Sequence, residues 1–334
     1  MKHKKTGFRS LALLAIASAG MLLPLAQAQA LAQAQASNFP SRPIKFIVPF
    51  PPGSGTDTSA RYFGKKLTEL TGQPVVVENR PGGNGFIAVQ AALYAPADGY
   101  TVFVGSNSTL AVNVALFKKL PYDPQTDFAP LSMMMRAPAV LVVPPDSPFK
   151  SVSDLVNAAK AQPGKLNYAA GSAGYQLMAE LFNDTAGVKT AHVPYKGASE
   201  ALTGVASGMV DLTFSDITAA QTLVKGGKVR ALAIASDRRA PALPDVPTTA
   251  EAKLPTYKAY VWVGAMVPAK TPKAEAEKLA SLLAQIERLP ETREFYERQG
   301  AETMNGGAEE MRRFQAEEIE LWKQIVTKAK VEQQ

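Results

Sequence analysis

The chain contains, near its start, Ile44-Lys45-Phe46-Ile47-Val48-Pro49-Phe50-Pro51-Pro52-Gly53-Ser54-Gly55-Thr56-Asp57. The first five residues are an apolar run typical of a buried strand, and a Pro/Gly/Ser turn separates them from a helical pattern that begins at Asp57. Such a junction leaves the first amides of the helix without partners inside the helix. Gly53 and Gly55 let a ligand approach the backbone, and the helix dipole favours an anion there. The junction therefore predicts an anion-binding turn.

Short apolar runs alternate with helical patterns along most of the chain, which predicts parallel sheets covered by helices, an α/β fold. The expected strands are Ile44–Val48, Pro74–Glu78, Tyr100–Val104, Ala139–Val143, Leu166–Ala169, Thr190–Val193, Val210–Phe214 and Val229–Ala235. The expected helices are Asp57–Leu70, Gly85–Tyr94, Val152–Ala161, Tyr175–Ala186, Ser199–Ser207 and Ala219–Lys225, followed by three charged amphipathic helices, Thr271–Glu287, Glu291–Gly300 and Ala308–Val331. We expect these last three to form a closing helical layer; a partner-binding helix is the alternative for the final one.

The middle of the chain is expected to form a separate lobe. The strand in Pro138–Pro145 enters it and the segment Pro255–Trp262 leaves it, so these two crossings should be adjacent strands at a hinge. The predicted domains are a discontinuous first domain, residues 37–138 plus 257–334, and a second domain, residues 139–256.

The N-terminus has the pattern of a secretory signal. Lys2, Lys4, Lys5 and Arg9 precede an apolar stretch that is too short for a full membrane span, and small-x-small cleavage sites follow. We expect residues 1–36 to be removed and the mature protein to be exported; an uncleaved anchor is the alternative.

Composition excludes several functional classes. Without the four basic residues of the signal, 32 basic and 29 acidic residues remain, and no basic run or nucleic-acid motif is present. The chain has no cysteine and two histidines, of which only His192 lies beyond the signal. A metal site needs several suitably spaced ligands, so we expect no metal and no cofactor. His192 is expected to be a structural or a cleft-lining residue.

Five junctions after strands are rich in Gly, Ser and Thr. They are Gly53–Asp57, Gly105–Thr109, Gly171–Gln176, Tyr195–Ser199 and Ser215–Thr218. Ligands of doubly wound sheets bind beyond the carboxyl ends of the strands, so all five can line one cleft between facing lobes. Amides and hydroxyls hold an anion without supplying a nucleophile and base, which indicates a binding site for a small carboxylate.

The expected ligand contacts come from these junctions and from Phe50. They are Phe50, Ser54, Gly55, Thr56, Asp57, Ser106, Asn107, Ser172, Ala173, Tyr175, Gln176, Tyr195, Lys196, Ser215 and Asp216. Structural alternatives exist for several: Asp57 as a first-turn acid, Lys196 as a solvated cation, and both tyrosines as residues that pack the lobes together. Arg80 is expected to brace its own loop.

Seven motifs in order resemble one family across the mature chain. They are Val48–Asp57, Val77–Gly82, Asp98–Thr101, Leu120–Pro124, Pro163–Tyr168, Val193–Gly197 and Leu243–Thr248. The chain resembles the Bug-type extracytoplasmic solute receptors, the substrate-binding components of tripartite tricarboxylate transporters. The resemblance implies a monomeric two-lobe Venus-flytrap protein of the periplasm that delivers a small organic carboxylate to a membrane permease.

The resemblance also assigns ligand contacts. It implies that the ligand carboxylate is held by Ser54, Gly55, Thr56 and Asp57 on one side and by Ser172, Ala173 and Gln176 on the other. Many relatives have His at the position of Gln176 and Asp-Asn at Ser215-Asp216, so an aromatic carboxylate, a dicarboxylate or tricarboxylate, and an acidic amino acid all remain open.

Two other functions remain as alternatives. An exported hydrolase or transferase would need an acid/base pair, for which His192 with Asp216 or Asp57 are the candidates. A ligand-sensing module would differ from a transport receptor only in its membrane partner.

Overall fold

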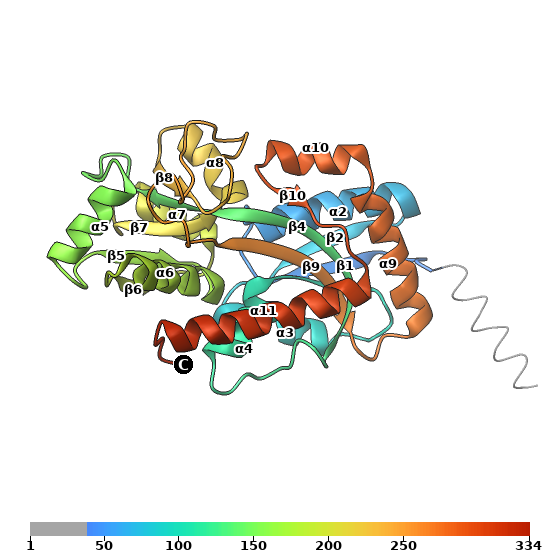
Figure 1. Cartoon of the computed structure of the whole chain (residues 1–334). Helices are drawn as coiled ribbons and strands as arrows, with labels where there is room; N and C mark the ends of the chain where they lie inside the picture. The colour runs from blue at the N-terminus through green and yellow to red at the C-terminus, as the bar shows by residue number, and fades with distance from the viewer. Residues whose placement is uncertain (1–38) are drawn as a thin grey trace, which may run out of the picture. The chain divides into compact units, whose positions relative to one another are not determined.

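Residues 39–334 are described by the computed structural model, and the expected signal segment lies outside the described residues. Within residues 42–334 the predicted alternation of strands and helices is present, and Figure 1 shows two groups of strands joined by the long strands β4 and β9. The strands are β1 (Ile44–Val48), β2 (Val75–Asn79), β3 (Thr101–Ser106), β4 (Phe128–Val143), β5 (Asn167–Ala170), β6 (Ala191–Pro194), β7 (Leu212–Asp216), β8 (Arg230–Ile234), β9 (Tyr260–Pro268) and β10 (Glu302–Thr303).

The strand order among the described residues is β2-β1-β3-β9-β4-β7-β5-β6, with β8 and β10 each pairing with β4. β1 is parallel to β2 and β3, and β5 is parallel to β6 and β7, as the sequence pattern predicts. β4 and β9 run antiparallel to their neighbours and to each other. The fold is therefore an α/β fold with two parallel groups, connected by an antiparallel pair.

β4 changes partners partway along its length. Its residues Phe128–Pro138 pair with β9, whereas Ala139–Val143 pair with β7 and β8. We call the strands β1, β2, β3, β9, β10 and Phe128–Pro138 the first half-sheet. The second half-sheet consists of β5 to β8 and Ala139–Val143. The two expected crossings, β4 and β9, are adjacent strands, as predicted.

Helices cover each half-sheet. They are α2 (Gly55–Thr71), α3 (Phe86–Leu93), α4 (Asn113–Leu116), α5 (Val152–Ala161), α6 (Ala173–Ala186), α7 (Ala198–Ala206), α8 (Ile217–Lys225), α9 (Lys273–Glu287), α10 (Pro290–Arg298) and α11 (Ala308–Lys328). α5 to α8 pack with the second half-sheet, α2, α3, α9, α10 and α11 pack with the first, and α4 packs against α11. None of the described helices is both long and apolar enough to span a bilayer.

Capping residues in the sequence correctly predicted the ends of several helices. Ser151 and Asp154 form the predicted capping box at the start of α5. Gly72 ends α2 in a left-handed conformation, with φ 71°, as predicted for a C-cap. The predicted start of the first helix at Asp57 is two residues late, because Ser54 caps the helix and Gly55 is its first residue.

The final helix closes the core of the first half-sheet, as predicted. Met311, Ile319 and Trp322 are buried and belong to the hydrophobic core. The carboxylate of Glu318 accepts hydrogen bonds from Tyr260 (2.7 Å) and Trp262 (2.9 Å) of β9, so α11 is fixed to β9 by polar contacts as well as by packing.

The sequence pattern missed several elements, among them α4, β10 and the part of β9 that follows Trp262. The first eleven residues of β4, Phe128–Pro138, were not predicted as a strand, and neither was the π-helical segment Ser108–Val112 that leads into α4. Both are almost wholly buried, so their sequences lack the polar alternation that marks a half-exposed strand or helix.

Candidate functional site

The β1–α2 turn presents the start of a long helix. The hydroxyl of Ser54 accepts a hydrogen bond from the amide of Asp57 at 3.2 Å, which caps α2. Among the described residues, no partner is recorded for the amides of Gly55 and Thr56. These amides and the positive end of the dipole of α2 are therefore available to an anion.

The carboxylate of Asp57 fixes the shape of this turn. It accepts hydrogen bonds from the amide of Gly53 (3.0 Å) and from Nδ2 of Asn79 (2.8 Å), and it forms an ion pair with Arg61 (3.0 Å). Asn79 also donates to the carbonyl of Phe50 at 2.9 Å. Asp57 is therefore occupied by donors from the protein and holds the Phe50–Asp57 turn in place.

The carboxyl end of β3 supplies a second set of polar groups. Ser106, Asn107 and Ser108 are all buried, and the amide of Ser108 donates to the hydroxyl of Ser106 at 3.2 Å. Asn107 Nδ2 lies 3.5 Å from the carbonyl of Tyr260, whereas Oδ1 of Asn107 has no hydrogen-bond partner. Oδ1 of Asn107 is thus a buried acceptor that the protein leaves unpaired at this strand end.

The turn before α6 meets the end of β3 from the other half-sheet. The hydroxyls of Ser108 and Ser172 lie 2.9 Å apart, and the amide of Gly174 donates to the hydroxyl of Ser108 at 3.1 Å. A β-carbon on Gly174 would be 2.5 Å from that hydroxyl oxygen, so only glycine leaves the amide this accessible. These bonds join the two half-sheets directly.

Tyr175 and Asp216 form a buried pair within the second half-sheet. The hydroxyl of Tyr175 donates to Oδ2 of Asp216 at 2.6 Å. Oδ1 of Asp216 accepts from the amide of Ala219 (3.0 Å) and from the hydroxyl of Thr218, so Asp216 caps α8. Burial, and next the neighbouring carboxylate of Asp216, raises the pKa of Tyr175 well above its usual value.

Glycines bring the turns of the two half-sheets into close approach. A β-carbon on Gly55 would lie 2.7 Å from both Oδ1 of Asp216 and the hydroxyl of Thr218. A β-carbon on Gly197 would lie 2.4 Å from the ring of Pro51. The junctions of the two half-sheets are therefore in contact with each other.

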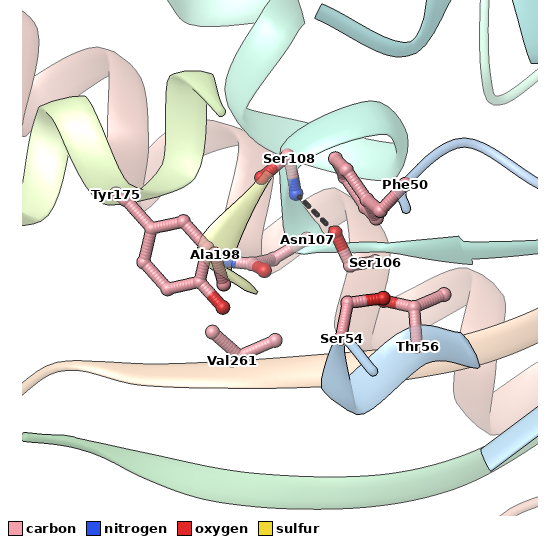
Figure 2. A pocket seen from close by; sticks show the side chains of 9 residues that line it. All are labelled: Phe50, Ser54, Thr56, Ser106, Asn107, Ser108, Tyr175, Ala198 and Val261. Atoms are coloured by element: carbon pink, nitrogen blue, oxygen red, sulfur yellow. Dashed lines mark hydrogen bonds between the residues drawn. The ribbon is translucent and has the colours of Figure 1, made fainter. Parts of the chain in front are cut away.

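These junctions surround a small pocket, shown in Figure 2. It is lined by Phe50, Ser54, Thr56, Ser106, Asn107, Ser108, Tyr175, Ala198 and Val261. Four of the five predicted junctions contribute, and the fifth reaches the pocket through the bond between Tyr175 and Asp216. The pocket has a volume of about 10 Å³, enough for about one water molecule.

The other predicted residues do not line the pocket. They are Gly55, Asp57, Ser172, Ala173, Gln176, Tyr195, Lys196, Ser215 and Asp216. Oε1 of Gln176 accepts from Nε2 of Gln334 at 3.3 Å, Lys196 is exposed, and the hydroxyl of Tyr195 packs against Gly204. Arg80 pairs with Glu78 at 2.5 Å, which agrees with a bracing role in its own loop.

Three lining residues were absent from the predicted contacts. Ser108 and Ala198 lie in two of the predicted junctions, so their positions at the starts of helices were the available signal. Val261 is an apolar residue of β9, and nothing in its sequence neighbourhood distinguishes it from the core.

His192 does not line the pocket. Its ring stacks on Tyr168, with centroids 5.2 Å apart. Burial lowers its pKa, while the carboxylate of Glu180 acts in the opposite direction. Among residues 39–334 no hydrogen bond joins His192 to Asp57 or Asp216, and no group of His, Cys, Asp and Glu there could hold a metal ion.

A model of the family described as tripartite tricarboxylate transporter family receptor matches residues 59–331 of this chain. The chain is also similar to protein BugT of Bordetella pertussis, with 35% identity over 314 residues that cover 93% of this chain and 94% of BugT.

Two solved structures from Rhodopseudomonas palustris share the fold. Rpa4515 with adipate is 34% identical, with a TM-score of 0.84 over 87% of this chain and 98% of that one. MatC (Rpa3494) with bound malate is 31% identical, with a TM-score of 0.81 over 86% of this chain and 100% of that one.

Proposed function

Because the chain belongs to the tripartite tricarboxylate transporter receptor family, we propose that it is a receptor that captures a small organic carboxylate in the pocket between its half-sheets. The observation that carries this proposal is the convergence of α2, α6 and α7 on one pocket through their first residues, together with the hydroxyls of Ser54, Thr56 and Ser106. Helix N-termini and hydroxyls stabilise an anion, and charge-assisted hydrogen bonds contribute roughly 1.5–3 kcal/mol each.

The same pocket gives little support to catalysis. Its polar lining consists of hydroxyls and one amide side chain, and the nearest carboxylates, Asp57 and Asp216, each accept several hydrogen bonds from the protein. General acid–base chemistry needs a titrating group within reach of the substrate. His192, the candidate base, stacks on Tyr168 instead. We therefore propose a binding protein that is not an enzyme.

Capture proceeds by hinge closure. The pocket is too small for an organic acid to enter from solvent, and it is bounded by turns from both half-sheets. β4 exchanges its partners between Pro138 and Ala139, which supports a first domain of residues 37–138 plus 257–334 and a second of residues 139–256. The ligand favours the closed state because only that state supplies both sets of donors.

The wider role follows from the family. We propose that the monomeric closed receptor delivers its ligand to the membrane permease of a tripartite transporter, and that residues 1–36 direct it to the periplasm. Related structures hold adipate and malate, which supports an aliphatic dicarboxylate ahead of an aromatic carboxylate. The ligand contacts in this proposal are the pocket-lining side chains and the free amides of Gly55 and Thr56.

A ligand screen tests the proposal. The melting temperature of the purified mature protein is measured in the presence of organic acids of each class, of neutral sugars and of cationic amino acids. The affinity for each compound that raises it is then measured by isothermal titration calorimetry. A ligand that binds the native state alone raises the melting temperature, so at least one carboxylate should do so. Binding of only sugars or cations, or turnover of a bound acid, contradicts the proposal.

A further inference from the structure

Asn107 offers the pocket an unused hydrogen-bond acceptor. The residue is fully buried and lines the pocket, and Oδ1 has no partner among the described residues. Its Nδ2 faces the carbonyl of Tyr260 at 3.5 Å. The opposite orientation of the amide would place two oxygens face to face, so Oδ1 is the atom left for a ligand.

Tyr175 offers the pocket an acceptor for a different reason. Its hydroxyl proton is committed to Oδ2 of Asp216 at 2.6 Å, inside the protein. Because burial and the Asp216 carboxylate keep the phenol protonated, its oxygen has only lone pairs to present to a guest. Figure 2 shows the Tyr175 and Asn107 side chains in the same part of the pocket.

The groups from the β1–α2 turn and β3 have the opposite character. The hydroxyl oxygens of Ser54 and Ser106 already accept backbone amides at 3.2 Å, which leaves their protons free to donate. The hydroxyl of Thr56 has no recorded partner among the described residues. The pocket therefore has a donor side, formed by these three hydroxyls, and an acceptor side, formed by Asn107 and Tyr175.

We propose that this receptor selects a carboxylate that carries an O–H or N–H donor close to its carboxyl group, and that Oδ1 of Asn107 is the acceptor that recognises this donor. The inference rests on the proposed function and specifies the class of its ligand. A plain aliphatic acid would meet the donor side but would leave the buried oxygen of Asn107 unpaired. An unpaired buried polar group is unfavourable, so the site discriminates against such a ligand.

Matched ligands test the proposal on the unmodified mature protein. Calorimetry compares the affinities for glutarate, 2-oxoglutarate, 2-hydroxyglutarate and glutamate. Two further series give the unsubstituted, 2-keto, 2-hydroxy and 2-amino forms of succinate and of 3-phenylpropanoate. Within the series that binds, the hydroxy or amino acid should bind about tenfold or more tightly than the unsubstituted and keto acids. The hydroxy and amino members distinguish an alcohol from an ammonium donor.

Variants then assign the preference to one atom. Asn107→Leu should reduce the preference to less than about threefold. Asn113→Leu should leave it unchanged, because Asn113 is also buried with an unpaired Oδ1 but does not line the pocket. Circular dichroism checks that each variant folds; if Asn107→Leu does not, the comparison of hydroxy with keto acids on the unmodified protein decides.

Two outcomes are distinguishable. Equal affinity for plain and donor-bearing acids, or a preference that survives in folded Asn107→Leu, overturns this inference and leaves the carboxylate receptor intact. Failure of every acid to bind contradicts the proposed function itself, and this inference with it.

Discussion

Gly55 lies so close to Asp216 that a β-carbon at position 55 would stand 2.7 Å from Oδ1 of that carboxylate. Gly55 is the first residue of α2, and Asp216 caps α8 in the other half-sheet. This contact is possible because Gly55 has no side chain and because the carboxylate of Asp216 already accepts hydrogen bonds from the start of α8 and from Tyr175. In the closure mechanism proposed above, the two half-sheets can approach this closely only if residue 55 has no β-carbon.

Gly55→Ala should weaken ligand binding about tenfold or more without loss of folding. The added methyl blocks the closed state, whereas alanine suits the first turn of a helix in the open state. Calorimetry with the acid identified by the screen measures affinity, and thermal unfolding without ligand checks the fold. Gly307→Ala is the matched control, because nothing lies within 4 Å of a β-carbon there. Unchanged affinity in Gly55→Ala would contradict the closure mechanism.

Thr56→Val should lower affinity about tenfold and leave the free energy of unfolding nearly unchanged. Valine keeps the shape of threonine but removes a hydroxyl that lines the pocket and has no recorded partner among the described residues. Thr56→Ser, which keeps the hydroxyl, should bind almost as well as the unmodified protein. If the valine variant binds normally, Thr56 is not a ligand donor.

Tyr175→Phe should destabilise the protein by about 1–3 kcal/mol and also weaken ligand binding. The change leaves Oδ2 of buried Asp216 without its 2.6 Å donor and removes an acceptor from the pocket. Tyr168→Phe is a useful comparison, since Tyr168 donates to Glu180 at 2.6 Å away from the pocket. Urea unfolding should show a loss in both variants, and calorimetry should show weaker binding only in Tyr175→Phe.

Glu287 should make stability fall as pH rises. The residue is 6% exposed, and Ser132 donates a short hydrogen bond to it. Burial raises the pKa of Glu287 to about 7. The hydrogen bond from Ser132, the charge of Arg288 and the amide of Gly306 lower this pKa, whereas the charge of Glu310 raises it. The folded state thus holds this proton more tightly than the unfolded chain, whose carboxyl titrates near 4.3.

The expected loss of stability from Glu287 develops between about pH 4.3 and 7, and it amounts to roughly 3–4 kcal/mol above that range. Glu287→Gln should remove this pH dependence. The free energy of unfolding of the variant, relative to that of the unmodified protein, should therefore be higher at pH 8 than at pH 5. Denaturant unfolding at the two pH values measures the difference, with exposed Glu309→Gln as the control. Parallel pH profiles for the unmodified protein and Glu287→Gln would exclude the role given to this carboxyl.

Local sequence determined much of the fold. Ile44–Val48 and Val152–Ala161 have the predicted bounds, because strong turn and cap signals flank them. The first part of β4 escaped prediction because it is buried and packed on β9, from which it is separated by more than 100 residues in the chain. Such long-range pairing leaves no periodic signal in a local window.

The sequence predicted which junctions line the pocket better than it predicted the individual residues and hydrogen bonds there. Gly/Ser/Thr turns at strand ends indicated Ser54, Thr56 and Tyr175, all of which line it. Val261 reaches the pocket only because β9 pairs with β3 and β4, a tertiary relationship. The hydrogen bond from Tyr175 to Asp216 is likewise a tertiary contact, because the two residues are 41 positions apart and meet only when α6 lies beside the start of α8.

A crystal structure of the protein with the acid that raises its melting temperature tests the central claim most directly. The account predicts the carboxylate within hydrogen-bond distance of Ser54, Thr56 or the amides of α2, with Tyr175 and the start of α6 enclosing it from the other half-sheet. A ligand bound outside this pocket, or held by one half-sheet alone with the junctions apart, would contradict it.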